Sequence, residues 1–230
     1  CPQLNIYIMN DYIHIIHIGK CAGGSVRKEL KKHNIKYKET HIDKHNFDPN
    51  EQYIILLRNP IQRIISAFNF RKYVIEDKGW IKGKYDAPNW MNELEKSMLF
   101  RYKSINQLAE DIYDDNNNLK LDLRNWDNYL RHVRENIHWH LIEQGNFLKK
   151  MNINNIKGVI VTETYNEDMK NIFNIDSTIH SKKIKNKYDR HLSKKGYKNL
   201  KTWLKKDYEC INILYNKNLI SKKQFELLSK

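Results

Sequence analysis

One stretch near the start of the chain constrains the fold more than any other. The apolar run YIHIIHI (residues 12–18) is followed at once by GKCAGGS (19–25) and then by a helical pattern that continues to residue 33. Short runs of β-branched residues predict buried strands, and two glycines before a helix predict a tight connection. Amide groups at a helix N-terminus, together with the positive end of the helix dipole, attract anions. The stretch therefore predicts a strand, a loop and a helix, in which the glycines serve either to hold an anion or to allow close packing.

Further strand and helix signals alternate along the chain. Apolar patterns predict strands at 35–40, 52–57 and 156–163, and Pro60 opens a helix at a position where its missing N–H costs nothing. Helical patterns also cover 127–150, 165–175, 194–215 and 221–228. Strands that alternate with helices are typical of an α/β fold. We expect a P-loop-like three-layer fold, with a central and mainly parallel sheet flanked by helices.

The size and composition fit one globular domain. Of the 230 residues, 40% are hydrophobic and 11% are aromatic, which is enough for an ordinary core. The pattern changes between about 74 and 127, where Gly79, Gly83 and Pro88 interrupt it and the stretch DIYDDNNNLKLD is polar. We expect a single domain over 1–230, with an insertion at about 74–127 that carries short helices and faces the substrate.

The charge and the cysteine content indicate which partners the protein can bind and exclude some kinds of site. The formal net charge of +14 attracts polyanions such as nucleic acid, acidic polysaccharide, phosphorylated cofactors or anionic membrane. Cys1, Cys21 and Cys210 are too few and too far apart for a disulfide framework or a CxxC metal site. No apolar run reaches the length of about 18 residues that a membrane span requires. Since the chain starts at Cys1, we expect a soluble domain that is either cytoplasmic or the lumenal part of a trimmed, membrane-anchored protein.

The first loop does not satisfy the Walker A pattern of nucleotide triphosphatases. That pattern requires Gly, four residues and then Gly-Lys-Ser/Thr. Aligned on Gly19 and Lys20, it would need Gly in place of His14 and Ser or Thr in place of Cys21. The chain thus lacks the hydroxyl that would contact Mg²⁺, which argues against an ATP-dependent phosphotransferase.

The segment HIGKCAGGS (17–25) resembles the 5′-phosphosulfate-binding loop of sulfotransferases that use 3′-phosphoadenosine 5′-phosphosulfate (PAPS). Carbohydrate-type members usually carry HIPKTGGTS at this place, and three positions match directly: Lys20, Gly23 and Ser25. Two of the replacements remove hydroxyl groups, but backbone N–H donation survives all of them. The resemblance implies that PAPS is bound by the following residues: Lys20, Cys21, Ala22, Gly23, Gly24, Ser25 and Val26.

A second element, LLRNPIQRIISAF (56–68), resembles the 3′-phosphate-binding element of the same family. Arg58 follows the predicted strand, and Ser66 comes about two helical turns later. A guanidinium can hold a phosphate through two charge-assisted hydrogen bonds, and a serine hydroxyl can add another. Such a pair would recognise a 3′-phosphate, which ATP lacks. The resemblance therefore implies PAPS as the donor and 3′,5′-adenosine bisphosphate as the product.

Two weaker matches extend the resemblance. HSKKIKNK (180–187) is similar to the basic loop that closes over the nucleotide, which implies contacts from Ser181, Lys182 and Lys183. NIHWHLIEQ (136–144) is similar to a His-Trp-x-Pro-Gln stretch of carbohydrate sulfotransferases, which implies that His138 and Trp139 face the acceptor. The ordinary alternatives are solvated lysines in the loop and a buried tryptophan beside a hydrogen-bonded histidine.

The implied chemistry is sulfuryl transfer by in-line displacement. Lys20 would stabilise charge on the bridging oxygen as the sulfur–oxygen bond breaks. The acceptor hydroxyl needs a base, and ETHIDKHNF (39–47) occupies the place where uronyl 2-O-sulfotransferase-like enzymes carry a His-x-His pair. His41 aligns with the second of those histidines and is the first choice. The alternatives are Glu39, Asp43, His45 and a residue of the insertion.

The spacing of the histidines does not predict a metal site. His138 and His140 are two apart on a predicted helix and point to different sides, whereas His41 and His45 follow a strand. The sequence thus predicts a PAPS-dependent O-sulfotransferase without a metal, whose partner is a hydroxyl-bearing acceptor, a carbohydrate and possibly an anionic one. The competing hypotheses are an ATP-dependent phosphotransferase and a non-catalytic, basic nucleic-acid-binding protein, for which no binding motif is present.

Overall fold

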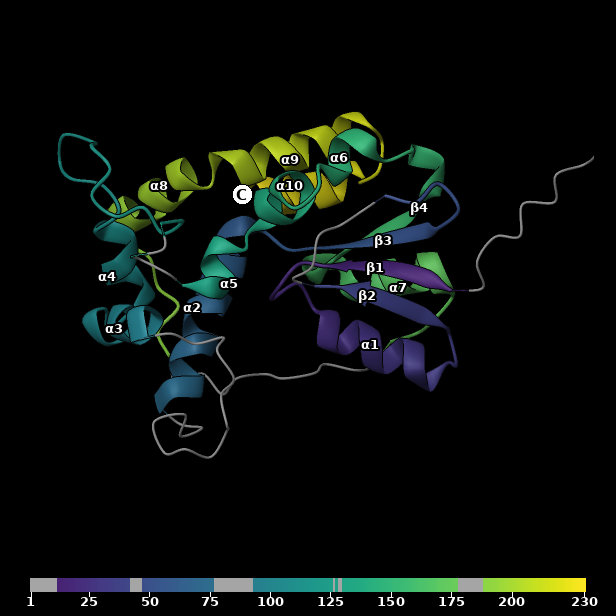
Figure 1. Ribbon diagram of the computed structural model, residues 1–230, viewed down its shortest axis with the longest axis horizontal. Coiled ribbons are helices and arrows are strands. Elements are labelled where there is room, and N and C mark those ends of the chain that lie inside the picture. Colours follow the sequence, from purple (N-terminus) through teal and green to yellow (C-terminus); the bar gives the residue numbers. More distant parts are fainter. Residues whose placement is uncertain (1–11, 42–46, 77–92, 126, 128–129, 178–187) are drawn as a thin grey trace, which may run out of the picture. The chain divides into compact units, whose positions relative to one another are not determined.

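The computed structural model describes residues 12–41, 47–76, 93–125, 127, 130–177 and 188–230. Contacts within the chain divide it into two compact units, which we describe separately (Figure 1). The first unit comprises residues 1–58, 137–182 and 210–230, and the second comprises 59–136 and 183–209. The predicted insertion at about 74–127 falls within the second unit, and the single domain over 1–230 stays a prediction.

The first unit is built on a parallel sheet of four strands in the order β2-β1-β3-β4. The strands are β1 (Ile13–His17), β2 (Tyr37–Thr40), β3 (Gln52–Leu57) and β4 (Ile156–Val161). β1 and β3 are the two central strands, and nearly all of their residues are buried. Continuous β-branched runs are what a strand covered on both faces requires. The parallel sheet with helices around it confirms the predicted α/β fold of the P-loop-like class.

Helices cover both faces of this sheet. The helices and turns of the unit are α1 (Gly23–Lys32), the π-helix η3 (Trp139–Glu143), α6 (Phe147–Lys150), the 3₁₀ turns η4 (Ile153–Asn155) and η5 (Thr162–Thr164), α7 (Tyr165–Phe173) and α10 (Lys222–Ser229). Gly23 at the start of α1 lies against the ring of His17. On the opposite face, Phe147 of α6 meets Tyr53 with the ring centroids 5.1 Å apart. Because successive strand residues point to opposite faces, His14 and His17 of β1 belong to different faces.

The second unit is helical. Its helices are α2 (Pro60–Glu76), α3 (Glu93–Arg101), α4 (Ile105–Glu110), α5 (Arg131–Arg134) and α8 (Lys194–Trp203), while α9 (Lys205–Asn216) contains the boundary between the two units. The short helices α3 and α4 lie in the segment where short helices were predicted, and Pro60 opens α2 as expected. Arg71 of α2 and Glu95 of α3 form a fully buried ion pair in this unit. In the ranges given above, no helix has the length and apolar character needed to cross a membrane.

The helical pattern predicted over 127–150 is broken in the structure into α5, η3 and α6. Arg63 of α2 is fully buried and donates to the backbone carbonyls of His132, Val133 and Glu135, which draws these carbonyls away from a continuing helix. A second break coincides with the left-handed residue Asn146, whose φ is 59°. The helix predicted over 194–215 is likewise divided, at Leu204, into α8 and α9.

Candidate functional site

The loop between β1 and α1 has a strained backbone. Lys20 and Ala22 have φ angles of 71° and 61°, in the left-handed region that costs a residue with a Cβ roughly 1–3 kcal/mol. Cys21 lies between them with a fully buried side chain, and its N–H donates to the Ile18 carbonyl at 3.2 Å. Left-handed residues in a short loop can turn successive N–H groups toward one point, as anion-binding nests do. Strain of this kind is retained where the surrounding structure or the function requires it.

The first turn of α1 supplies amide donors beside this loop. Ser25 and Val26 donate to the Ala22 carbonyl at 2.8 and 3.1 Å, so their amides are used within the turn. The amides of Gly23 and Gly24 come earlier, where a helix offers no preceding helical carbonyl. The first turn also carries no acidic side chain. Of the residues predicted to hold the phosphosulfate, Gly23 and Gly24 therefore have the amides best suited to an anion, at the positive end of the helix dipole.

Arg58 brings the second predicted element to the same loop. It follows β3 directly, and its Nη1 donates to the Lys20 carbonyl at 3.4 Å. Its Nε lies 3.8 Å from Oε1 of Glu163, a residue of η5 at the end of β4. The guanidinium of Arg58 thus lies next to the backbone of the loop that carries Lys20, within the first unit. Ser66 lies half-buried on α2 in the second unit, and its role stays a prediction.

Three histidine rings stack beside the start of α1. His17 and His41 lie with ring centroids 4.2 Å apart and an angle of 14° between their planes. The ring of His140 is also nearly parallel to that of His41, with the centroids 6.2 Å apart and an angle of 7° between the planes. These residues come from the end of β1, the residue after β2, and η3. The sequence predicted a role for His41 alone. The parallel register of Ile16 with Thr40 would have placed His17 beside it.

Glu39 of β2 is contacted by two side chains, His17 and Arg27. Its carboxylate accepts from Nδ1 of His17 and from Nη1 of Arg27, whose distances to the two carboxylate oxygens are 3.2 and 3.3 Å. Burial alone would raise the pKa of Glu39. The hydrogen bond from His17 and the charges of His17, Arg27 and His41 outweigh burial and lower that pKa below its ordinary value. Both oxygens of the carboxylate are contacted by these partners, which weakens Glu39 as an alternative base.

The hydrogen bonds of His41 fix which ring nitrogen is basic. Nδ1 of His41 lies 2.7 Å from the backbone carbonyl of His17, and a carbonyl oxygen can only accept. Nδ1 therefore carries the proton, and Nε2 is the nitrogen with the lone pair. Burial, reinforced by the charge of His17, lowers the pKa of His41 to about 4. The ring is consequently neutral, and able to take up a proton, throughout the neutral pH range.

Gly23→Ala should destabilise the protein, because no room exists for a side chain at this position. A Cβ on Gly23 would lie 2.2 Å from Nε2 of His17, whose ring is held by Glu39 and stacked on His41. We expect the free energy of unfolding to fall by about 1–3 kcal/mol, the usual cost of overpacking, in urea denaturation. Gly24→Ala is the control, since alanine is favoured within a helix. Equal stability of the two variants would contradict the packing described here.

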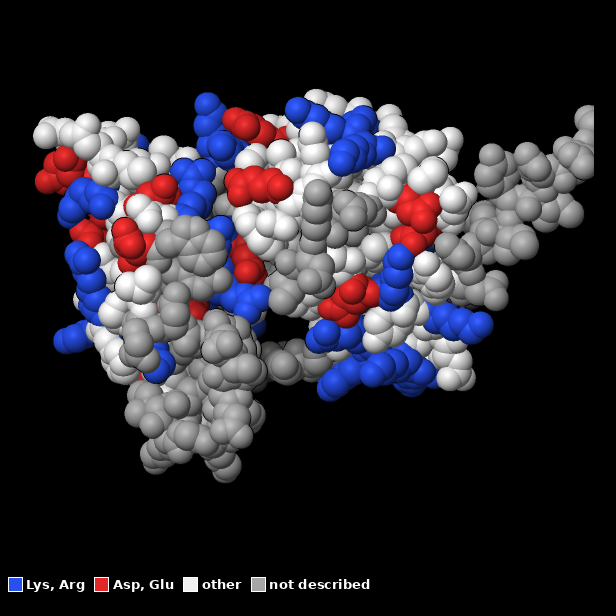
Figure 2. Space-filling view, viewed as in Figure 1, with Lys and Arg blue, Asp and Glu red and all other residues white. Residues whose placement is uncertain are grey.

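Positive charge gathers on the exposed surface of α1, the helix that follows the loop. Figure 2 shows Lys and Arg side chains gathered over α1. The exposed cations of this helix are Arg27, Lys28, Lys31 and Lys32, whereas its one acidic residue, Glu29, is fully buried. Such a surface raises the local concentration of anionic molecules near the start of the helix.

Of the remaining residues predicted for the site, only two lie in the described part of the chain. Asp43, His45, Ser181, Lys182 and Lys183 lie outside the described residues. Trp139 is largely buried, with 8% of its surface exposed, and Nδ1 of His138 donates to Glu143 at 2.9 Å. Both observations fit the ordinary structural alternative, and acceptor contact by His138 and Trp139 stays a prediction, while the neighbouring His140 contributes to the histidine stack.

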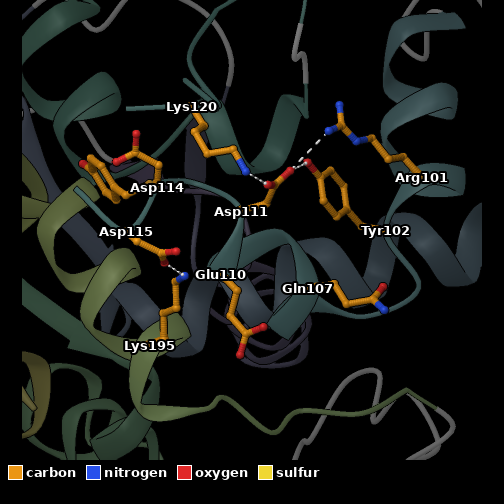
Figure 3. Close-up of a pocket in the computed structure, with 10 residues that line it drawn as sticks. Arg101, Tyr102, Gln107, Glu110, Asp111, Asp114, Asp115, Lys120 and Lys195 are labelled. Atoms are coloured by element: carbon orange, nitrogen blue, oxygen red, sulfur yellow. Dashed lines mark hydrogen bonds and ion pairs between the residues drawn. The ribbon is translucent and has the colours of Figure 1, made fainter. Parts of the chain in front are cut away.

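A cavity of about 510 Å³ lies in the second unit, within the segment predicted to face the substrate (Figure 3). It is lined by Arg101, Tyr102, Gln107, Glu110, Asp111, Tyr113, Asp114, Asp115, Lys120 and Lys195. Asp111 accepts from Arg101 at 3.2 Å and also from Tyr102 and Lys120, and Lys195 donates to Asp115 at 2.6 Å. The charges that line this cavity are largely paired with one another, so the catalytic chemistry is better sought at the loop of the first unit.

Two further findings concern the site: its possible metal ligands, and the comparison of the chain with known proteins. In the part of the chain that the structure describes, no group of three or more His, Cys, Asp or Glu side chains could hold a metal ion. A family model described as "Sulfotransferase family" matches residues 12–221. No curated protein and no solved structure matches the chain. The matched range begins just before β1 and includes the loop, Arg58 and the histidine stack.

Proposed function

The chain belongs to the sulfotransferase family, and we propose that it moves the sulfuryl group of PAPS to a hydroxyl of a carbohydrate acceptor. Family membership supports sulfuryl transfer and an acceptor with a hydroxyl. The observation that best supports PAPS as the donor is the position of Arg58, whose guanidinium lies 3.4 Å from the carbonyl of Lys20. The loop and Arg58 would thereby contact opposite ends of PAPS.

The residues present fit this donor. The strained turn at Lys20 and Ala22 and the amides of Gly23 and Gly24 suit a phosphate, since backbone N–H groups at a helix start are anion donors. Arg58 suits the 3′-phosphate, because a guanidinium can contact two phosphate oxygens at once. When bound, PAPS supplies the sulfuryl group and a leaving group that departs as 3′,5′-adenosine bisphosphate.

We assign the proton transfer to His41 and the charge stabilisation to Lys20. As the acceptor oxygen bonds to sulfur, Nε2 of His41 takes the hydroxyl proton and the ring becomes an imidazolium. The bond between sulfur and the bridging oxygen breaks, and the ammonium of Lys20 stabilises the charge left on that oxygen. Atoms and charge balance without a metal or a redox partner. His41 is preferred to Glu39 as the base because the Glu39 carboxylate is held by His17 and Arg27.

A carbohydrate acceptor is proposed from the sequence resemblance and from the surface charge. HIGKCAGGS resembles the loop of carbohydrate-type enzymes, and the cationic surface of α1 would attract an acidic sugar chain.

Transfer of label from radiolabelled PAPS to a panel of acceptors tests this proposal. The panel should contain neutral polysaccharides, uronate-containing polysaccharides, and phenols or small alcohols. We expect labelled polysaccharide, with the uronate-containing chains as the best acceptors, and no transfer of phosphate from γ-labelled ATP to any of them. Label in small alcohols or phenols alone would overturn the carbohydrate assignment. Transfer from ATP but not from PAPS would overturn the function itself.

A further inference from the structure

We propose that Glu39 is a positioning residue that acts on His41 through His17. The proposal rests on the proposed function, because it takes His41 as the base. Glu39 stands where uronyl 2-O-sulfotransferase-like enzymes carry the first histidine of their pair, and its own basicity is suppressed by its partners. Its contacts in the first unit indicate instead that it holds the ring of His17 in place.

Glu39 fixes the ring of His17. Its carboxylate accepts from Nδ1 of His17, so Nδ1 carries a proton and Nε2 faces the start of α1. Arg27, one turn along α1 from the loop, contacts both oxygens of the same carboxylate at 3.2 and 3.3 Å. The His17 pair is largely buried, with exposed side-chain fractions of 9% for His17 and 14% for Glu39. A carboxylate held at two points leaves little freedom for the imidazole that it binds.

His17 in turn joins the donor loop to His41. On one side its ring fills the space that a Cβ of Gly23 would need, which ties it to the first turn of α1. On the other side its ring stacks on His41, and its backbone carbonyl accepts from Nδ1 of His41. A shift of His17 would therefore move the base relative to the phosphosulfate-binding loop. Misplacement by about 1 Å can cost 100-fold in rate.

His17 also influences the proton affinity of His41. The titratable and charged groups that face His41 are His17 of β1, Glu39 of β2, Arg27 of α1 and His140 of η3. Among these charges, that of His17 lowers the pKa of His41 more than that of Glu39 raises it. Removal of Glu39 takes away both its own charge and the hydrogen bond that holds His17, so the titration of His41 should change.

Glu39→Leu and Glu39→Gln test the proposal, with Glu51→Gln as the matched control. Glu51 accepts from Nδ1 of His14 at 2.7 Å, so it forms an equivalent buried pair on the opposite face of the sheet. The measurements are kcat, the Kd of 3′,5′-adenosine bisphosphate, the melting temperature, and the titration and tautomer of each histidine by NMR of the ring nitrogens.

We expect Glu39→Leu to lower kcat by about 100-fold, with an unchanged Kd for the bisphosphate and with the titration midpoint of His41 shifted from that of the wild type. Glu39→Gln should retain much more activity, since its amide oxygen still accepts from His17. Glu51→Gln should change stability but neither kcat nor the His41 titration.

Two results would overturn the proposal: an unchanged His41 titration in Glu39→Leu, or losses of kcat in Glu39→Leu and Glu51→Gln that simply follow their losses of stability. A wild type without sulfuryl transfer refutes the proposed function, and the NMR titration still decides separately whether Glu39 controls His41.

Discussion

Lys20→Ala is expected to lower the rate of sulfuryl transfer by about 1,000-fold, the effect of removing one preorganised group that stabilises transition-state charge. Lys20 lies in the loop at the start of α1, and charge develops on the bridging oxygen only as the bond to sulfur breaks. The loss should therefore fall mainly on kcat, and binding of 3′,5′-adenosine bisphosphate should weaken far less. Single-turnover transfer from radiolabelled PAPS measures the effect.

The control for this variant is Lys28→Ala. Lys28 is exposed on the same helix, so its removal subtracts the same charge from the surface without touching the loop. Its rate should stay close to that of the wild type. Lysine and alanine both carry a Cβ, so the left-handed backbone at position 20 costs a similar free energy in either case. Undiminished turnover by a folded Lys20→Ala variant would rule out the role assigned to this lysine.

His41→Ala should lower kcat by about 100- to 10,000-fold, which is the usual contribution of a general base. The variant removes Nε2, the ring nitrogen that the hydrogen bond to the His17 carbonyl leaves as the proton acceptor. His191→Ala, at an exposed position in the second unit, serves as the control and should retain full activity. Wild-type kcat in His41→Ala would transfer the role of base to one of the alternatives given by the sequence, which are Glu39, Asp43, His45 and a residue of the insertion.

The pH dependence follows from the lowered pKa of His41. The base works in its neutral form, and in the free protein this form persists down to about pH 4. We therefore expect kcat/KM, which reports the free enzyme, to fall with protonation of His41 only near pH 4. Negative charge on a bound donor favours the imidazolium, so the corresponding fall in kcat should occur at higher pH. An acid limb of kcat/KM at the ordinary histidine value would contradict the burial of His41 described above.

The central fold could be predicted because its signals are local. The β-branched runs of β1 and β3 and the proline that opens α2 each determine the conformation of their own segment. The predicted helix over 127–150 was wrong because its interruption depends on Arg63, more than 60 residues away along the chain, whose guanidinium draws three carbonyls out of the helical pattern. A periodic apolar pattern carries no information about such a distant donor.

The residues of the candidate site also fall into two groups, those that belong to short motifs and those that only the fold brings together. Lys20, the glycines of the loop and Arg58 could be predicted as site residues because they occupy fixed places within two short motifs. His17 and His140 were not assigned a role, since their relation to His41 depends on strand register and on the position of η3. Glu39 was considered as a base, whereas the contacts of its carboxylate with His17 and Arg27 favour a supporting role. Each of these relations joins segments that are distant in the sequence.

The most direct measurement is the melting temperature of the wild type with 3′,5′-adenosine bisphosphate, compared with an equal concentration of 5′-AMP. A ligand that binds the folded state alone stabilises it according to its affinity, so the comparison needs no knowledge of the acceptor. We predict a clearly larger increase with the bisphosphate, and a difference that shrinks in Arg58→Ala. Equal increases with the two nucleotides would contradict recognition of a 3′-phosphate by Arg58, and with it the assignment of PAPS as the donor.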